Sequence, residues 1–349
     1  MHATMHSTMF IKLLRGLVLT VSAIILIPSA KVLAGDSSFS DVPERHPAFE
    51  AIENLKERGI ISGYPDGKFR PNNNVNRAEA LKLIVAPIIL DEQLSEYSTS
   101  SYEDVPNTSW FFPYTERAFR NLKIIDGPPV ATSFFGERTV NKVEFLKMLI
   151  LANNADPQAF NEIDLPLTED VNSAEEWYYP YMRYSLSASL ITTDENKLLN
   201  PDEELTRADT ALILYNFLEY SEKKRTQATL SSAEKEIIYT LERLSEDDIE
   251  NAKLSSVRAL LYARGANSIH PDEVVVQSTV KITEGFRALV EAYIAGTKWY
   301  LEDVITHAGQ AWDLADSAKN INPDLIIIAN ELQRIAKSMA DDARSNRGE

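Results

Sequence analysis

Cysteine is absent from this 349-residue chain. The absence excludes disulfide bridges, thiolate zinc sites and thiol nucleophiles, although it leaves the redox compartment open. The sequence also lacks a nucleophile elbow, a phosphate-binding loop and a His-Glu-x-x-His zinc motif. Long apolar runs are missing too. The run from Gly16 to Ile27 has 12 residues, whereas a membrane-spanning helix needs roughly 20.

This short apolar run has the flanks of an export signal. Lys12 and Arg15 supply a positive segment before it, and Pro28 ends it. Val32-Leu33-Ala34 then places small or modest residues at the expected −3 and −1 positions of a cleavage site. We therefore expect residues 1–34 to be a signal peptide cleaved after Ala34. The alternative is an uncleaved membrane anchor, which the short run disfavours. The mature chain is expected to be exported to the cell surface or cell wall, without a transmembrane segment.

Positive charge is in short supply. The chain has 35 Lys and Arg against 52 Asp and Glu, a formal net charge of −17. Removing residues 1–34 takes away three basic residues and no acid, which leaves −20. A chain this acidic is a poor nucleic-acid binder, because phosphate contacts need clustered Lys and Arg. Any anionic ligand would need a local cationic pocket.

The sequence does contain a repeat, which is the first feature to read for fold class. Three units occupy residues 36–95, 100–155 and 165–220. Each unit opens on an Asp-Val pair, continues with a predicted helix and an apolar pair, and then starts a second helix at a basic residue. The basic residues are spaced by 65 and 65. The landmarks, in unit order, are Asp41-Val42, Asp104-Val105 and Asp170-Val171; Ile60-Ile61, Ile124-Ile125 and Leu190-Ile191; Arg77, Lys142 and Arg207.

Local signals define each helix–loop–helix unit. In the first unit, Gly59 is suited to end a helix in a left-handed conformation, and Asp66-Gly67 predicts a turn. Asn76 then suits an N-cap, with Glu79 three residues later to complete a capping box. Thr206 and Asp209 are placed in the same way in the third unit. The units are therefore expected to be α-helical.

Units of this form resemble S-layer homology (SLH) repeats. The resemblance rests on FSDV at 39–42, GIISGYPDGKFRP at 59–71, NRAE at 76–79 and TRAD at 206–209. It implies a mainly α fold in which three SLH repeats form a pseudo-threefold spindle. It also implies non-covalent attachment to the bacterial cell wall through secondary cell-wall polysaccharide, often with pyruvylated sugars, or through a peptidoglycan-associated polymer.

The basic residue of each unit is the first candidate for ligand binding. Arg77, Lys142 and Arg207 fall at the first helical position, where unpaired backbone N–H groups and the helix dipole favour anions. Arginine adds a bidentate grip on a carboxylate, which Lys142 cannot reproduce. The alternative is a salt bridge to an acid of a neighbouring unit.

Aromatic and acidic residues complete the predicted polysaccharide site. Aromatic rings offer apolar faces to sugars, and the aspartates can accept hydrogen bonds from sugar hydroxyls. The alternative for the tryptophans is a core anchor, and that for the aspartates is a brace on the first helix. These residues are Trp110, Trp177, Tyr64, Gly63, Asp41, Asp104 and Asp170.

The pattern changes after the repeats. Residues 221–230 are predicted to be a polar linker, and residues 231–349 an α-helical bundle of about four helices with apolar residues at helical spacing. We expect helices to start near Ser231 and Asp248, a break from Gly265 to Pro271, one long helix from Asp272 to Lys319, and a last helix capped by Asn322-Pro323.

Nothing in the helical region points to chemistry. His307 stands alone there, and a single histidine on a helix is far more often structural than a ligand. We therefore expect a non-enzymatic protein without cofactor or metal, whose helical region is a spacer, an assembly module or a partner-binding module. Two alternatives remain: an SLH-anchored envelope enzyme with an active site in the helical region, and a lattice module with weak glycan affinity. A deep polar cleft would favour the enzyme, and a closed apolar core would favour assembly.

Overall fold

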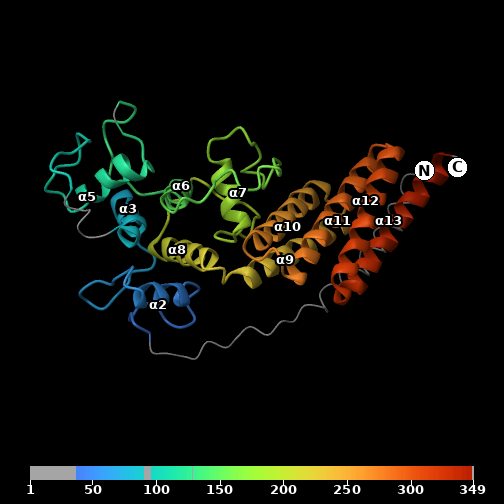
Figure 1. Ribbon diagram of the computed structural model, residues 1–349, viewed down its shortest axis with the longest axis horizontal. Helices are drawn as coiled ribbons and strands as arrows, with labels where there is room; N and C mark the ends of the chain where they lie inside the picture. Colours follow the sequence, from blue (N-terminus) through green and yellow to red (C-terminus); the bar gives the residue numbers. More distant parts are fainter. Residues whose placement is uncertain (1–36, 90–95, 128, 348–349) are drawn as a thin grey trace.

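The computed structural model describes residues 37–89, 96–127 and 129–347, and the described chain is mainly helical (Figure 1). The predicted signal peptide and its cleavage site at Ala34 lie outside these residues. Within the described ranges, no helix has both the length and the apolar character required to cross a bilayer.

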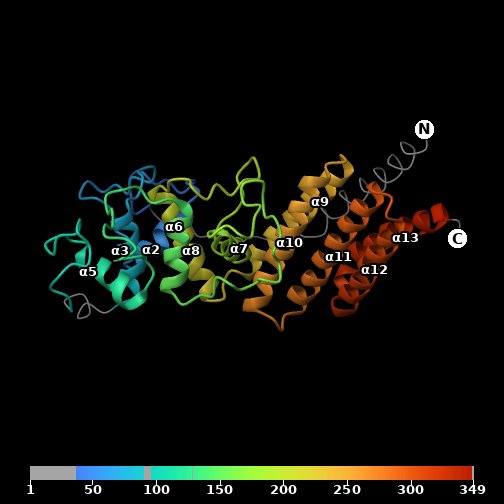
Figure 2. The same ribbon diagram turned by 90° about the horizontal axis from the view of Figure 1, so that it is seen from above.

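The repeat units form one end of an elongated molecule, and the C-terminal helices form the other (Figures 1 and 2). Each unit contributes a first helix, a loop and a second helix. The first helix of the second unit is short and runs into a π-helical turn, η2. The helices of the units are α2 (Phe49–Glu57), α3 (Arg77–Val85) with the 3₁₀ turn η1 (Ala86–Ile88), α5 (Phe112–Glu116) with η2 (Arg117–Leu122), α6 (Lys142–Ala152), α7 (Tyr179–Ser187) and α8 (Arg207–Ser221).

A closed ring of backbone hydrogen bonds joins the three units around a pseudo-threefold axis. The Val75 amide donates to the Leu205 carbonyl at 3.0 Å, the Leu205 amide donates to Val140 at 3.1 Å, and the Val140 amide donates to Val75 at 3.0 Å. All three side chains are buried. Each unit therefore donates one hydrogen bond of the ring, so the three units form a single structure rather than three separate ones.

The second helices begin where the sequence predicts. Capping boxes are present at all three N-termini, formed by Asn76 and Glu79, by Asn141 and Glu144, and by Thr206 and Asp209. The cap side chain accepts from the backbone N–H at the third helical position, and the acid at that position accepts from the backbone N–H of the cap residue. These caps depend on residues only three positions apart, which explains why the sequence locates them correctly.

The C-terminal region has five helices rather than about four. They are α9 (Thr226–Ser245), α10 (Ile249–Ile269), α11 (Val274–Thr297), α12 (Leu301–Ile321) and α13 (Ile326–Arg347), with the 3₁₀ turn η3 (Pro323–Leu325) before the last. Each helix packs mainly on its neighbours in sequence, so the region is an array of successive helical hairpins (Figure 2). The helix start expected at Asp248 and the N-cap expected at Asn322 are confirmed, whereas the start expected near Ser231 is wrong, since α9 begins at Thr226.

The single long helix expected from Asp272 to Lys319 is wrong. The chain turns at residues 298–300, where Trp299 adopts a left-handed conformation with φ 59°, and α12 then runs back along α11. Residues 298–300 contain no glycine or proline that would predict a turn. The apolar residues that pack α12 against α11 lie in one shared cluster.

One hydrophobic cluster extends from the repeat units into the helical array. Residues of α10, including Leu260, Leu261 and Tyr262, belong to the same apolar cluster as the three units. The predicted linker is correspondingly shorter, since α8 ends at Ser221 and α9 begins at Thr226. Arg225 anchors the connection by donating from Nε and Nη2 to the Ser189 carbonyl, at 2.9 and 2.7 Å. This contact with the third unit makes a polar segment helical where composition alone suggests a linker.

Gly265 is a packing residue and not a helix break. The helix α10 continues through it to Ile269, and its backbone lies against the Ser187 carbonyl of α7. A Cβ built at Gly265 would stand 1.8 Å from that oxygen. The missing side chain therefore permits the close approach of α10 to the third unit.

A buried arginine of α10 also bridges the junction. Arg258 of α10 donates from Nε to Glu236 of α9 at 3.0 Å and from Nη1 to the Leu167 carbonyl of the third unit at 2.9 Å. The Arg258 side chain is 1% exposed. Since a buried charge must be paired to be tolerated, these contacts fix the array and the third unit to each other.

Candidate functional site

The helix N-termini at the three basic residues are not open anion sites. The backbone N–H groups of Arg77, Lys142 and Arg207 donate at 2.8 Å to Arg138, Glu203 and Asn73, each a carbonyl of the next unit in the ring. The N–H groups at the second helical position donate to the same neighbouring loops, and those at the third donate to the caps. The predicted dipole site is therefore wrong, because the loop of the next unit satisfies these donors.

The side chains of the three basic residues have different partners. Arg77 pairs with Glu144 of the second unit, with Nη1 and Oε1 3.5 Å apart, and lies over the Phe134 ring. Burial lowers the pKa of the Arg77 guanidinium, and Glu144 opposes that shift. Lys142 donates to Glu203 Oε2 and to the Leu199 carbonyl of the third unit, both at 2.7 Å. The salt bridge to a neighbouring unit thus accounts for these two residues.

Arg207 has no carboxylate partner within the described chain. Its Nε donates to the Phe69 carbonyl at 2.8 Å and its Nη2 donates to the Ser62 carbonyl at 3.2 Å, both in the first unit. The guanidinium also lies 4.5 Å from the centroid of the Phe69 ring and 5.1 Å from that of Tyr64. Neutral carbonyls orient this cation without cancelling its charge.

The aspartate of each Asp-Val pair holds the loop before the second helix. In the first unit, Asp41 accepts from the backbone N–H groups of Phe69 and Arg70, both at 2.8 Å. Asp104 accepts from residues 134 and 135, and Asp170 from residues 199 and 200, in the same way. The carboxylates therefore brace the loop rather than the first helix, and their predicted contacts with sugar hydroxyls stay a prediction.

The two tryptophans of the repeats are not core anchors. Trp110 is 50% exposed and Trp177 is 55% exposed. A lysine of the preceding unit's second helix lies over each ring: Lys82 Nζ is 5.7 Å from the centroid of Trp110, and Lys147 Nζ is 5.6 Å from that of Trp177. Each unit interface between α3 and α5, or between α6 and α7, thus presents an aromatic surface with a cation beside it.

Tyr64 and Gly63 belong to the loop that faces Arg207. The Tyr64 ring contacts the guanidiniums of Arg207 and Arg70. Gly63 is required by packing, because a Cβ there would stand 2.4 Å from the Phe39 ring. Their roles are therefore to shape and support the loop next to the basic residue.

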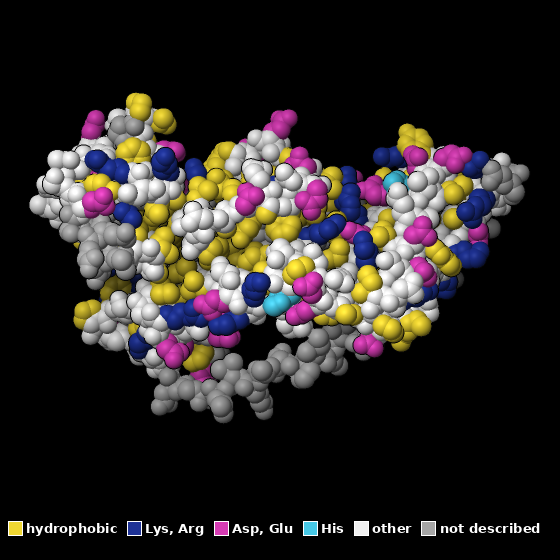
Figure 3. All heavy atoms as spheres, in the orientation of Figure 1, with side chains coloured by type: hydrophobic (Ala, Val, Ile, Leu, Met, Phe, Trp, Pro, Cys, Tyr) yellow, Lys and Arg dark blue, Asp and Glu magenta, His cyan; other side chains and the backbone are white. Residues whose placement is uncertain are grey.

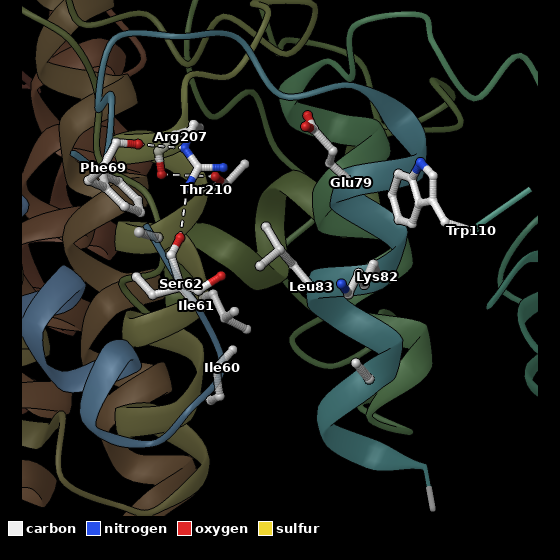
Figure 4. A pocket seen from close by; sticks show the side chains of 13 residues that line it. Ile60, Ile61, Ser62, Phe69, Glu79, Lys82, Leu83, Trp110, Arg207 and Thr210 are labelled. Carbon is white, nitrogen blue, oxygen red and sulfur yellow. Dashed lines mark hydrogen bonds between the residues drawn. The ribbon is translucent and has the colours of Figure 1, made fainter. Parts of the chain in front are cut away.

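A groove of about 280 Å³ brings several of these residues together, and we call it the first groove. Arg207 and Thr210 of α8 lie on one wall with Ser62 and the apolar pair of the first unit, and Glu79, Lys82 and Leu83 of α3 lie on the other (Figure 4). Trp110 of the second unit also lines the groove. Hydrophobic side chains are exposed on the face of the molecule that Figure 3 shows.

Lys82 is the residue of this groove that the sequence reasoning missed. It follows Arg77 by five positions, and Lys147 follows Lys142 by the same interval. The spacing of 65 that defines the basic residues therefore also relates these two lysines. The third unit has Leu212 at this position, which breaks the pattern.

The fold is a helical spindle with pseudo-threefold symmetry, and one groove between its units carries two cations and an exposed tryptophan. Comparison with known proteins agrees. Residues 38–81 and 168–211 match the S-layer homology domain. The chain therefore carries SLH domain matches in its first and third units.

The curated relatives include S-layer proteins and an enzyme. The chain is 24% identical over 305 residues to the surface-layer 125 kDa protein of Lysinibacillus sphaericus, covering 83% of this chain and 24% of that protein. It is 23% identical over 331 residues to S-layer protein EA1 of Bacillus anthracis, covering 90% and 37%. It is 26% identical over 188 residues to an amylopullulanase of Thermoanaerobacterium thermosulfurigenes, covering 53% and 10%. The chain thus spans well under two thirds of the length of these relatives.

Proposed function

We propose that this chain is an exported anchoring protein that holds to the bacterial cell wall through its SLH spindle. The domain matches and the similarity to S-layer proteins support a cell-surface role. In this proposal the middle unit, residues 100–155, is a third and diverged SLH repeat. Its hydrogen bonds in the central ring, its capping box and its braced loop all correspond to those of the two matched units.

The observation that carries the polysaccharide-binding part is the first groove. It places Lys82 beside the exposed indole of Trp110 and Arg207 on the facing wall, and neither cation has a carboxylate within ion-pair distance in the described chain. An indole face packs against a sugar ring, and a guanidinium and an ammonium together attract an acidic group on that sugar. Secondary cell-wall polysaccharide or a peptidoglycan-associated polymer provides both features.

Co-sedimentation with cell-wall sacculi tests the proposal. The chain from residue 35 onward is the protein to use, since residues 35–220 alone would uncover the apolar residues that α10 buries. We expect it to sediment with sacculi that retain their secondary polymer and to remain soluble with sacculi from which the polymer has been removed. Equal sedimentation with both preparations would contradict polysaccharide binding.

Substitutions in the groove make the test specific. Trp110→Ala and Lys82→Met alter side chains without a hydrogen bond in the described chain, so folding should be preserved. Each should weaken binding by about tenfold, the size expected for losing one aromatic or charge-assisted contact. Trp312→Ala is the matched control, because Trp312 is an exposed tryptophan of α12, outside the spindle. Loss of binding by the control as well would remove the first groove as the site.

We propose that the helical array is a spacer, assembly or partner-binding module. Its five helices pack through a continuous apolar core, which favours a structural role over an enzyme. The alternative is an SLH-anchored envelope enzyme, and the amylopullulanase among the relatives shows that an enzyme can share this region of similarity. An open depression of about 540 Å³ on the array carries Glu284, Asp313 and His307. In the described ranges, no group of three or more metal-ligating side chains forms a candidate metal site.

A further inference from the structure

The pseudo-threefold symmetry gives each residue of the first groove two counterparts. The second groove combines Arg77 of the first unit, Glu144, Lys147 and Asp126 of the second, and Trp177 of the third. The third groove combines Lys142 of the second unit, Thr192, Asp209 and Leu212 of the third, and the His46-Pro47 pair of the first. The three sets of residues correspond to one another in the sequence repeat but differ in charge.

The first groove keeps two cations available. Arg207 bonds only to carbonyl oxygens, and Lys82 has the Trp110 ring as its partner, within the chain that the structure describes. Glu79 lines the same groove, but its carboxylate accepts from the backbone N–H of Asn76 and pairs with neither cation. The apolar pair here is followed by Ser62, which brings no charge.

The second groove neutralises itself. Arg77 pairs with Glu144, which also accepts from Arg138. Lys147 Nζ lies 3.9 Å from Asp126 Oδ2, and Asp126 stands where the first groove has Ser62. One acid thus faces each cation, so an anion entering this groove would have to displace an internal carboxylate.

The third groove lacks the second lysine and the tryptophan of the first groove. Lys142 is bound to Glu203, Leu212 replaces the second lysine, and a His-Pro pair replaces the tryptophan. Neither the aromatic face nor a free cation remains at these positions.

We infer that this chain binds a sugar-linked acidic group in the first groove alone. In the second groove, the carboxylates of Asp126 and Glu144 pair with the cations and so prevent an acidic group from binding there. The inference rests on the proposed function, and it makes each chain univalent for the wall polymer. The specificity-determining residues are Lys82 and Arg207 on the binding side, with Ser62 in place of an acid. Two charge-assisted contacts to one acidic group distinguish an acidic glycan from a neutral one.

Fluorine NMR reads the grooves separately. The chain has four tryptophans, so 5-fluorotryptophan labelling gives four resonances, assigned by single Trp→Phe variants. The probe is wall polysaccharide solubilised by muramidase. The acidic group of the probe is either a carboxylate or a phosphate. Carbodiimide–borohydride reduction removes the charge of the carboxylates, and hydrofluoric acid removes the phosphates, so the two treatments distinguish these sources. We expect the untreated probe to shift Trp110 and leave Trp177 in place, and one of the two treatments to abolish the shift.

Restoring the second groove is the stronger test. The double variant Asp126→Ser with Glu144→Gln removes both internal acids, and glutamine still serves the capping box. The Trp177 resonance of this variant should shift when the probe is added, and the number of probe-binding sites per chain should rise from one to two. Lys82→Met should weaken binding by about tenfold, whereas Lys147→Met in the unmodified chain should leave it unchanged.

The outcomes separate this inference from the proposed function. Equal shifts of Trp110 and Trp177 in the unmodified chain, or a folded double variant without a second site, would overturn the inference while leaving wall binding intact. Failure of the chain to sediment with polymer-bearing sacculi would overturn the proposed function, and the inference with it.

Discussion

At the residue scale, one aspartate per unit stabilises a strained loop conformation. The residues that follow the loop's buried side chain adopt positive φ in all three units: 58° at Arg70, 57° at Phe135 and 49° at Asn200. A left-handed conformation costs a non-glycine residue roughly 1 kcal/mol. The carboxylate of the Asp-Val pair accepts from the N–H of this residue and of the one before it, and charge-assisted bonds of this kind offset the strain.

Replacing Asp41 with alanine should therefore destabilise the protein. Two backbone N–H groups lose their acceptor, one of them on the buried Phe69, so we expect the free energy of unfolding to fall by about 1.5–3 kcal/mol. Denaturant unfolding followed by circular dichroism measures the change. Glu44→Ala is the matched control, because Glu44 is an exposed acid three residues away and should change stability by less than about 0.5 kcal/mol. Equal stability of both variants would refute the brace.

At the scale of elements, the joint between α7 and α10 decides how the two regions meet. Gly265 allows the backbones to touch, and the Tyr220 hydroxyl donates to the Gly265 carbonyl at 3.0 Å. Because both sides of the contact are backbone, neither side can move aside as a flexible side chain would. The close approach is therefore specific to glycine at this position.

Gly265→Ala should destabilise the protein even though alanine is the better helix former. The new methyl group would overlap the Ser187 carbonyl, and overpacking of this kind costs about 1–3 kcal/mol. Thermal unfolding should show a lower Tm. Gly309→Ala offers the opposite case in α12, since nothing lies within 4 Å of its added Cβ, and it should stabilise by roughly 0.5–1 kcal/mol. A Gly265→Ala variant as stable as Gly309→Ala would contradict the packing role.

At the scale of the whole molecule, the spindle and the helical array form one continuous body. The shared hydrophobic cluster, the bond from Arg258 to Leu167, and the Arg225 contact with Ser189 all cross the junction. A connection of four residues leaves little freedom between α8 and α9. A wall-bound spindle would therefore hold the array at a fixed angle rather than on a tether.

Spin-label distances test this rigidity, and the absence of native cysteine makes the labelling clean. Glu195→Cys and Thr306→Cys place labels on exposed positions of the third unit and of α12. We expect a single narrow distance distribution, as narrow as that of Thr306→Cys with Lys337→Cys inside the array. A broad or multi-component distribution for the first pair alone would show a flexible junction.

The sequence alone determined what depends on neighbouring residues. The capping boxes and the Asp-Val landmarks were readable because each is set by side chains within a few positions of one another, and the 65-residue register was readable because these local signals recur along the chain. They were sufficient to identify three helix–loop–helix units and the SLH resemblance. The sequence also placed Arg207 and Trp110 among the ligand candidates, although it did not distinguish them from their counterparts.

Only the tertiary structure decided which candidates remain available for a ligand. Arg77 and Lys142 pair with carboxylates 67 and 61 positions along the chain, whereas Arg207 meets carbonyl oxygens 138 and 145 positions away. The backbone N–H groups at the three helix N-termini, expected to be unpaired, also donate to carbonyls of the next unit, which are distant in sequence. The charge state of a groove is a property of the three units together, and no single repeat contains it.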